Sequence, residues 1–235
     1  MKFGVFDGET LVSKFVIPTR RDYTAAEIAA EISGRIPSGI EGSILSSVVP
    51  EVNESLDTFL FQAVGRSARL VKATDDLGLS INFPVGDAGT DHLINSFAAA
   101  EIYGVPCIIV AFGTATTIDV VNREREHRGG LIAPGPRATA KALEIITSKL
   151  PEVEIHEVPN VISTNSIDAV RSGIFYSQVG LVNTAVPHIR SEIGKDAKVI
   201  ATGGFAPLFA GSCRFIDHVE PDLTLLGLKM LYSRG

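Results

Sequence analysis

Cysteine is scarce in this sequence of 235 residues, in which Cys107 and Cys213 lie far apart. Neither belongs to a CxxC pair, and the five histidines are scattered rather than spaced with cysteine as zinc ligands would be. We therefore predict buried free thiols rather than a disulfide, and no metal-ligating residues. The P-loop, HExxH and GxSxG motifs are absent too, so the sequence carries none of these three catalytic signatures.

Basic clusters and long apolar runs are also lacking. With 27 acidic against 21 basic residues the net charge is −6, which argues against a nucleic-acid partner or an anionic membrane surface. The longest apolar run, Val105–Phe112, is far shorter than the roughly 20 residues that cross a bilayer. Met1–Thr10 shows no basic region followed by an apolar core, so we predict no signal peptide and expect a cytoplasmic protein.

The composition, with 45% apolar and 20% charged residues, is typical of a globular protein. Patterns typical of strands and of helices alternate along the sequence. In the first half, two β-branched runs flank Asp7-Gly8, which predicts a hairpin. Thr24 and Glu27 have the spacing of a capping box, and Asn53 is expected to cap the next helix. These signals predict mixed strands and helices in this half.

The pattern restarts in the second half with Cys107–Phe112, a continuous apolar strand, followed by a turn over Gly113–Thr116. Ser166 is expected to open a long helix toward Ile193, in which Pro187 would produce a kink or an early end. The repetition predicts an α/β protein of two domains with mixed sheets, joined near Gly104–Pro106. Further elements are expected at Thr117–Val121, Gly130–Ala133, Arg137–Leu150, Lys198–Ala201, Phe215–Val219 and Asp222–Tyr232.

Four positions could carry chemistry, and each also has an ordinary structural explanation. The turn at Gly113 and the pair Gly203-Gly204 would let the backbone approach a phosphate, yet such turns commonly just connect two elements. Asp91, in the first turn of a helix expected over Thr90–Tyr103, is stabilised there by the helix dipole whatever its function. Ser166 has the position of a helix cap. The residues alone leave both interpretations open.

Five short motifs follow one another along the chain. They are Phe3-Gly4-Val5-Phe6-Asp7-Gly8, Gly89-Thr90-Asp91-His92, Ala111-Phe112-Gly113-Thr114-Ala115-Thr116-Thr117, Gly129-Gly130-Leu131-Ile132-Ala133-Pro134-Gly135 and Ala201-Thr202-Gly203-Gly204. Their order and spacing resemble the type III pantothenate kinase family, within the superfamily of sugar kinases, actin and heat-shock chaperones. The resemblance extends from about Phe3 to Arg234 and is specific, because five separate motifs fall in the family's order.

The resemblance implies a fold and an activity. The fold would be two ribonuclease-H-like domains with mixed sheets, residues 1–104 and 105–235, of which the first would lack its opening strand. The activity would be ATP-dependent phosphorylation of pantothenate in coenzyme A biosynthesis. ATP and a divalent cation are the implied cofactors, with a monovalent cation as a further candidate. A dimer is implied as well, either of identical chains or with a complete paralogue.

The family's residue roles can be carried over position by position. Asp91 matches the proposed general base, which takes the proton of the pantothenate hydroxyl as the γ-phosphoryl group arrives. Ser166 matches a threonine that reaches the pantothenate bound by the neighbouring subunit. The other implied substrate-binding residues are Gly89, Thr90 and His92, and the implied ATP- and phosphate-binding residues are Gly113, Thr114, Thr117, Gly203 and Gly204.

Three departures from the family bear on the chemistry. The family's opening strand, with its Asp-x-Gly-Asn-Thr turn, is expected to have no counterpart here, because Met1 falls where the second strand should begin. A cation-holding aspartate of the family is Ala111 in this chain, and a substrate-binding arginine is His92, which cannot form a bidentate fork. Three hypotheses follow: an active kinase, a subunit that supports a complete paralogue, and a degenerate or regulatory binding protein of the same fold.

Overall fold

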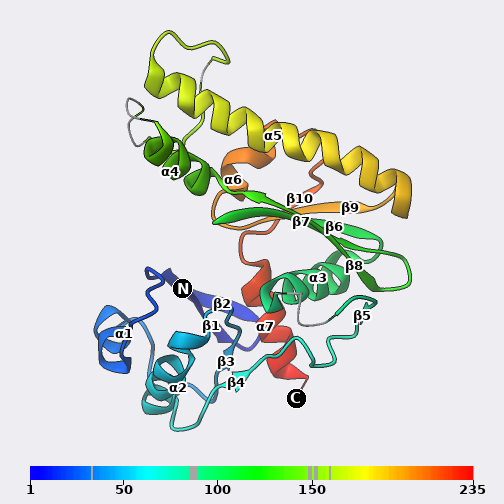
Figure 1. Ribbon diagram of the computed structural model, residues 1–235. Helices are drawn as coiled ribbons and strands as arrows, with labels where there is room; N and C mark the ends of the chain where they lie inside the picture. The colour runs from blue at the N-terminus through cyan, green and yellow to red at the C-terminus, as the bar shows by residue number, and fades with distance from the viewer. Residues whose placement is uncertain (33, 85–88, 148–149, 151–152, 159, 235) are drawn as a thin grey trace. The chain divides into compact units, whose positions relative to one another are not determined.

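The computed structural model describes residues 1–32, 34–84, 89–147, 150, 153–158 and 160–234, and its chain forms two compact units (Figure 1). The first unit comprises Met1–Leu77, Pro84–Asn95 and Thr224–Gly235, and the second comprises Gly78–Phe83 and Ser96–Leu223. The helix α3 (Thr90–Tyr103) therefore contributes residues to both units. The assignment of two ribonuclease-H-like domains with a boundary near Gly104–Pro106 stays a prediction.

The first unit contains two small sheets and the helices that pack with them. Strands β1 and β2 pair antiparallel around Gly8, whose φ of 55° suits glycine, so the predicted hairpin is confirmed. Strands β3 and β4 pair in parallel. Ile28, Leu56 and Phe59 lie in its apolar core. The bounds are β1 Lys2–Asp7, β2 Thr10–Val16, α1 Ala25–Ile32, β3 Ile44–Leu45, α2 Pro50–Val64 and β4 Arg69–Leu70. The helix α7 (Leu223–Ser233) also belongs to this unit, except for its first residue.

The starts of α1 and α2 test two capping predictions. The Glu27 amide donates to the Thr24 hydroxyl at 3.2 Å, and the Thr24 amide donates to the Glu27 carboxylate at 2.9 Å, so the capping box is confirmed. The prediction for Asn53 was wrong, because α2 already begins at Pro50. Proline is favoured at the first helical position, where its missing N–H leaves no bond unmade.

The second unit is built on a mixed sheet with the strand order β10-β9-β6-β7-β8-β5. Strand β6 pairs in parallel with β9 and antiparallel with β7, and β7 pairs antiparallel with β8. Strands β6, β8 and β9 therefore run in one direction and end at the same edge. The bounds are β5 Ser80–Ile81, β6 Cys107–Phe112, β7 Ala115–Val121, β8 Glu126–Pro134, α4 Pro136–Ile146, α5 Ser166–Ile193, β9 Lys198–Thr202, α6 Ala206–Phe209 and β10 His218–Val219.

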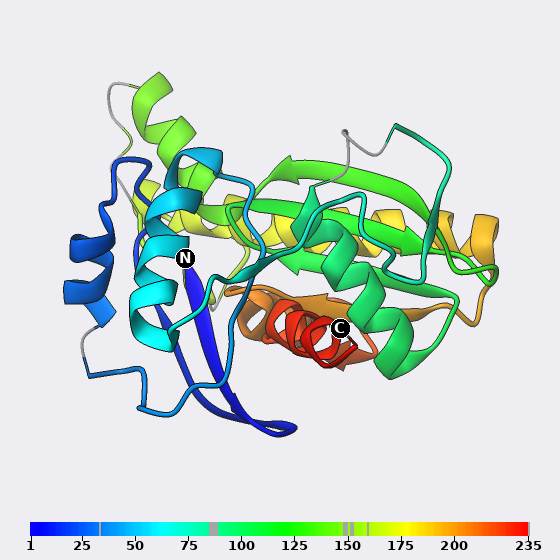
Figure 2. The ribbon, with the colours of Figure 1, turned by 90° about the horizontal axis from the view of Figure 1, so that it is seen from below.

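Helices cover both faces of this sheet. Helix α5 lies along one face, and the part of α3 that belongs to this unit lies along the other (Figures 1 and 2). Ile108, Val110 and Phe112 of β6 pack in the core on the α5 side, whereas Cys107 and Ile109 pack with alanines of α3. All five are fully buried, which explains why β6 is apolar at every position rather than at alternate ones.

The long helix α5 begins at Ser166 as predicted, but Ser166 is not its cap. The Asn165 side chain accepts from the Asp168 amide at 2.9 Å and occupies that position instead. Pro187 does not end the helix early, because α5 continues to Ile193. Buried side chains before the proline, among them Val182 and Val186, hold the helix against the sheet despite the lost hydrogen bond.

Two other elements are shorter than predicted. The strand expected over Phe215–Val219 is confined to His218–Val219, and the helix expected over Arg137–Leu150 is observed at Pro136–Ile146.

Candidate functional site

The connection between β6 and β7 is the tight turn that the sequence predicted. Strand β6 ends at Phe112 and β7 begins at Ala115, so only Gly113 and Thr114 lie between the two strands. The Gly113 amide donates to the Ala115 carbonyl at 3.0 Å and closes the turn. The turn stands at the carboxyl end of β6, the edge where ligands bind in many α/β sheets.

Two further glycines, which follow the ends of β8 and β9, pack closely against this turn. The Gly135 amide donates to the Thr114 carbonyl at 3.1 Å, and a Cβ on Gly135 would collide with the Gly113 and Thr114 carbonyls. Gly203 has a φ of 91°, and a Cβ there would collide with the Phe112 backbone. We call Gly113, Gly135 and Gly203 the glycine junction. Close packing requires glycine at Gly135 and Gly203.

Gly204, which the resemblance also implied as an ATP-binding residue, is in a different situation. A Cβ on Gly204 would meet no atom within 4 Å, so the space beside it is open. Its neighbour Phe205 donates its amide to the Phe112 carbonyl at 3.1 Å, which ties the β9–α6 loop to the β6–β7 turn. Gly204 therefore lies beside the junction without being needed to build it.

The three threonines at this turn have different surroundings. Thr114 is exposed on the turn itself. Thr116 is fully buried and donates to the Gln178 side chain at 2.5 Å, on the α5 side of the sheet. Thr117 is 6% exposed and its hydroxyl lies 3.4 Å from the Asp119 carboxylate. Of these hydroxyls, that of Thr114 is the one placed to meet a ligand from solvent.

Asp119 is a residue that the sequence reasoning missed. Its carboxylate is 5% exposed on β7, on the same face as Thr117, and the facing residue on β8 is Gly130. On this face, Ala111 pairs with Thr117 on one side and with Thr202 on the other. Burying a carboxylate is costly unless it has partners, so the burial of Asp119 marks it as a candidate, and this burial is not visible in the sequence.

Asp91 and its neighbours stand at the start of α3, in the first unit. The Gly89 carbonyl accepts from the His92 amide at 3.1 Å and from the Leu93 amide at 3.3 Å. A Cβ on Gly89 would lie 2.8 Å from an Asp91 carboxylate oxygen, so that side chain folds back over Gly89. Thr90, Asp91 and His92 are all half-buried.

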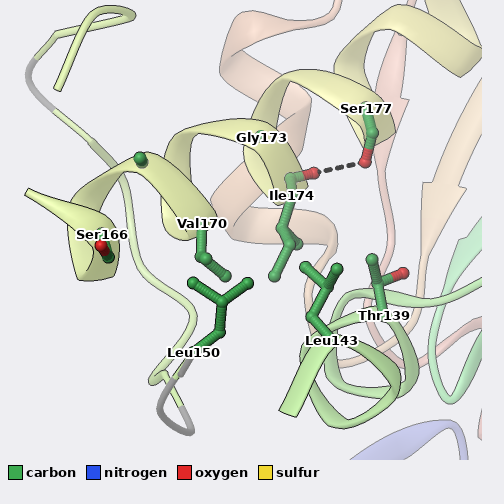
Figure 3. A pocket seen from close by; sticks show the side chains of 9 residues that line it. Thr139, Leu143, Leu150, Ser166, Val170, Gly173, Ile174 and Ser177 are labelled. Atoms are coloured by element: carbon green, nitrogen blue, oxygen red, sulfur yellow. Dashed lines mark hydrogen bonds between the residues drawn. The ribbon is translucent and has the colours of Figure 1, made fainter. Parts of the chain in front are cut away.

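Ser166 lies at one end of a groove between α4 and α5 (Figure 3). The groove has a volume of about 460 Å³, and the side chains of Leu143, Leu150, Val170 and Ile174 point toward one another along it (Figure 3). Hydroxyl-bearing residues also line it, including Ser166, Thr139 and Ser177. The Thr139 hydroxyl donates to the Gly135 carbonyl at 3.0 Å, so the groove begins one helical turn from the glycine junction.

The two cysteines are free and buried, which confirms the prediction of unpaired thiols. Burial raises the pKa of Cys107 to about 12 and that of Cys213 to about 11, so neither is a nucleophile at neutral pH. The described residues contain no group of three or more His, Cys, Asp or Glu side chains that could hold a metal ion.

The fold and the junction together define a mixed α/β protein with glycine turns at the carboxyl edge of its sheet. A solved structure from Campylobacter jejuni, described as a conserved Baf family transcriptional activator, shares this fold. It superposes with a TM-score of 0.56 over 83% of this chain and 84% of that one, at 20% sequence identity.

Comparison of sequences identifies the family within this fold class. The family model described as type III pantothenate kinase matches residues 1–188. Type III pantothenate kinases of Syntrophotalea carbinolica and Halalkalibacterium halodurans are 37% and 36% identical, over 99% of this chain and 94% of each relative. That of Streptomyces griseus is 37% identical over 99% of this chain and 93% of its own length. The chain belongs to the type III pantothenate kinase family.

Proposed function

We propose that the chain acts as an ATP-dependent kinase that phosphorylates pantothenate in coenzyme A biosynthesis. The observation that carries this proposal is the glycine junction, which lies at the carboxyl edge of the sheet in a chain of this family. The names of relatives about 37% identical over nearly the whole chain support the reaction and the substrate.

The glycine junction fits the polyphosphate of a nucleotide. Gly113 and Gly204 carry no side chain that would block a ligand, and turn amides and hydroxyls are good donors to phosphate oxygens. Thr114 contributes its exposed hydroxyl at the turn. Thr117, buried beneath, would act through Asp119 rather than on the phosphates directly.

A divalent cation would supply charge neutralisation to the transferring phosphoryl group. Magnesium is commonly bound through one or two carboxylates together with the substrate phosphates, so a cluster of three protein ligands is not required. Asp119 is the carboxylate on the sheet face that Ala111 and Thr117 share, and its oxygen chemistry suits such an ion. We propose that Asp119 serves the cation here, in place of the family's aspartate at Ala111.

Asp91 is the proposed general base. It is half-buried in the first turn of α3. A base in this position would take the proton of the pantothenate hydroxyl as phosphoryl transfer proceeds. Gly89, Thr90 and His92 would form the adjoining substrate-binding segment.

Strand topology supports the assignment of the second unit as a ribonuclease-H-like domain. Its strands β8-β7-β6-β9-β10 form a meander followed by two parallel strands, with β7 alone reversed. The first unit would be the related N-terminal domain, represented by its hairpin and by the parallel pair β3–β4.

A dimer would complete the site through Ser166. Its hydroxyl is not used as a helix cap, and exposed apolar side chains occur at the end of α4 and in the segment just before α5, the two helices that form the groove. Ile145, Ile146 and Ile162 are 71%, 80% and 87% exposed, which is typical of an interface rather than of a free surface. The partner would be a second chain of this family, identical or a complete paralogue.

The departures at Ala111 and His92 define the second candidate function, a heteromer with a complete paralogue. In that arrangement the paralogue would hold ATP, cation and base, while this chain would supply Ser166 and the dimer surface. A degenerate regulatory protein of the same fold is the remaining alternative. The described residues contain no helix both long and apolar enough to span a membrane, and a cytoplasmic location stays a prediction from the sequence.

The test is ATP-dependent phosphorylation of pantothenate by this chain alone, by the paralogue alone and by the two mixed. Activity of this chain alone would support an independent kinase. Activity only in the mixture, reduced by Ser166→Ala in this chain, would support the heteromer. No activity in any arm that contains this chain would contradict both and leave the regulatory alternative.

A further inference from the structure

Two loops of the glycine junction repeat one arrangement. Gly135, at the end of β8, packs against the β6–β7 turn, and two residues later comes Arg137. Gly203, at the end of β9, packs against the same segment of chain, and two residues later comes Phe205. The Arg137 guanidinium lies over the Phe205 ring, 5.3 Å from its centroid. This pair therefore joins the two loops beside the turn.

The contact of Arg137 with the ring requires none of its N–H donors. A cation over an aromatic ring is held by the ring's π electrons, while the N–H donors of arginine point outward in its own plane. Phe205 is itself held in place, because it packs against the core with Phe209 at 6.2 Å between ring centroids. Arg137 is exposed to solvent.

Within the described part of the chain, no carboxylate forms an ion pair with Arg137. The first turn of α4 contains no acidic residue. Among the ion pairs between described residues, none involves Arg137, whereas Lys141, one turn further along α4, is paired with Glu144 at 2.8 Å. An unneutralised guanidinium held at this position suits an anionic ligand.

We propose that Arg137 binds the phosphates of the nucleotide at the Gly113–Thr114 turn, and that Phe205 is a positioning residue that orients the guanidinium. This inference rests on the proposed nucleotide site and adds a residue to it. The outward N–H edge matches the oxygens of a phosphate, which arginine can bind in a bidentate fork.

The competing role for Arg137 is stacking on the adenine base, because a guanidinium can also stack on a flat aromatic ring. The two roles differ in what they recognise. Phosphate binding requires the charge and the N–H edge and is absent with adenosine. Stacking would act equally on ATP and on adenosine.

The experiment is calorimetric titration of the full chain with ATP and, separately, with adenosine. We expect Arg137→Gln to weaken ATP binding by about 10- to 100-fold, the range expected for charge-assisted hydrogen bonds, and to leave adenosine binding unchanged. Arg137→Lys should weaken ATP less, because the charge is kept and the fork is lost. The matched control Lys141→Gln removes a cation from the same helix and should bind ATP as the parent does.

Phe205 is tested by a pair of variants and by its dependence on Arg137. Phe205→Leu should weaken ATP binding, and Phe205→Tyr, which keeps the ring, should restore it. In the Arg137→Gln background Phe205→Leu should change ATP affinity little, a result that a purely structural role would not give.

Unchanged ATP affinity in Arg137→Gln would overturn the inference while leaving the proposed function standing. An equal loss for ATP and adenosine would replace phosphate binding by base stacking and would also overturn it. A parent chain that binds no ATP would overturn the proposed nucleotide site and the inference together.

Discussion

The two units hold their candidate residues by different means. In the second unit, backbone groups of three loops contact one another, so the positions of Gly135 and Gly203 are set by steric exclusion. In the first unit, Asp91 and His92 lie in the opening turn of a helix, and their side chains rather than the backbone would do the chemistry. Substitutions at Gly135 or Gly203 should therefore mainly lower the stability of the fold, whereas substitutions at Asp91 or His92 should mainly lower turnover.

The largest effect on stability is expected from Gly203→Ala. The new Cβ would collide with the Phe112 backbone, and alanine would be strained at a φ of 91°. We expect the free energy of unfolding to fall by about 3 kcal/mol, the combined size of overpacking and backbone strain. Urea denaturation measures the change.

Gly204→Ala is the matched control for that variant. It makes the same substitution at the next residue, where a Cβ meets nothing within 4 Å. Its unfolding free energy should stay within about 0.5 kcal/mol of the parent. Equal losses in the two variants would show that the packing of the junction does not depend on Gly203.

Asp91→Asn should separate turnover from stability. If the chain is active, alone or in a mixture, we expect turnover to fall by roughly 10²-fold or more, with ATP affinity little changed, because the general base is lost and the shape is kept. The unfolding free energy should change far less than in Gly203→Ala. Steady-state rates and ATP titration provide the two measurements, and undiminished turnover would remove Asp91 from the role of base.

The smallest effect on stability is expected from Glu27→Gln, which removes the carboxylate of the capping box in the first unit. Hydrogen bonds from the Thr24 amide and hydroxyl, together with Arg20, lower the pKa of Glu27 from 4.5 to about 2. Since the folded pKa is depressed, the stabilisation is present above pH 4.5 and is lost as pH falls toward 2. The stability difference between the parent and Glu27→Gln should therefore shrink between pH 5 and pH 2.

Denaturation of both proteins across that pH range provides the measurement. A difference that stays constant with pH would show that the Glu27 carboxylate interacts no more strongly in the folded state than in the unfolded one.

Much of the local structure could be predicted from the sequence, because the relevant signals involve neighbouring residues. Asp7-Gly8 predicts its hairpin and Thr24 with Glu27 predicts the start of α1, since each motif forms its bonds within a few positions. Errors arose where two local signals competed. Pro50 took the helix start assigned to Asn53, and Asn165 took the cap assigned to Ser166.

The candidate site could be predicted only in part. The turn at Gly113 follows from an apolar strand that ends in glycine, and its significance came from the family resemblance. The contacts of Gly135 and Gly203 with that turn join loops distant in sequence, so no local pattern reveals them. Asp119 was missed because a single carboxylate in a strand is uninformative until its burial is known.

The most direct test of the nucleotide site is an NMR titration of the ¹⁵N-labelled chain with ATP. If the nucleotide phosphates bind at the glycine junction, the amide signals of Gly113, Thr114 and Gly204 should shift with ATP. Signals of the capping box at Thr24 and Glu27, on a different part of the chain, should not move. ATP binding that leaves the amides of Gly113, Thr114 and Gly204 unshifted would contradict the assignment of the junction as the phosphate site.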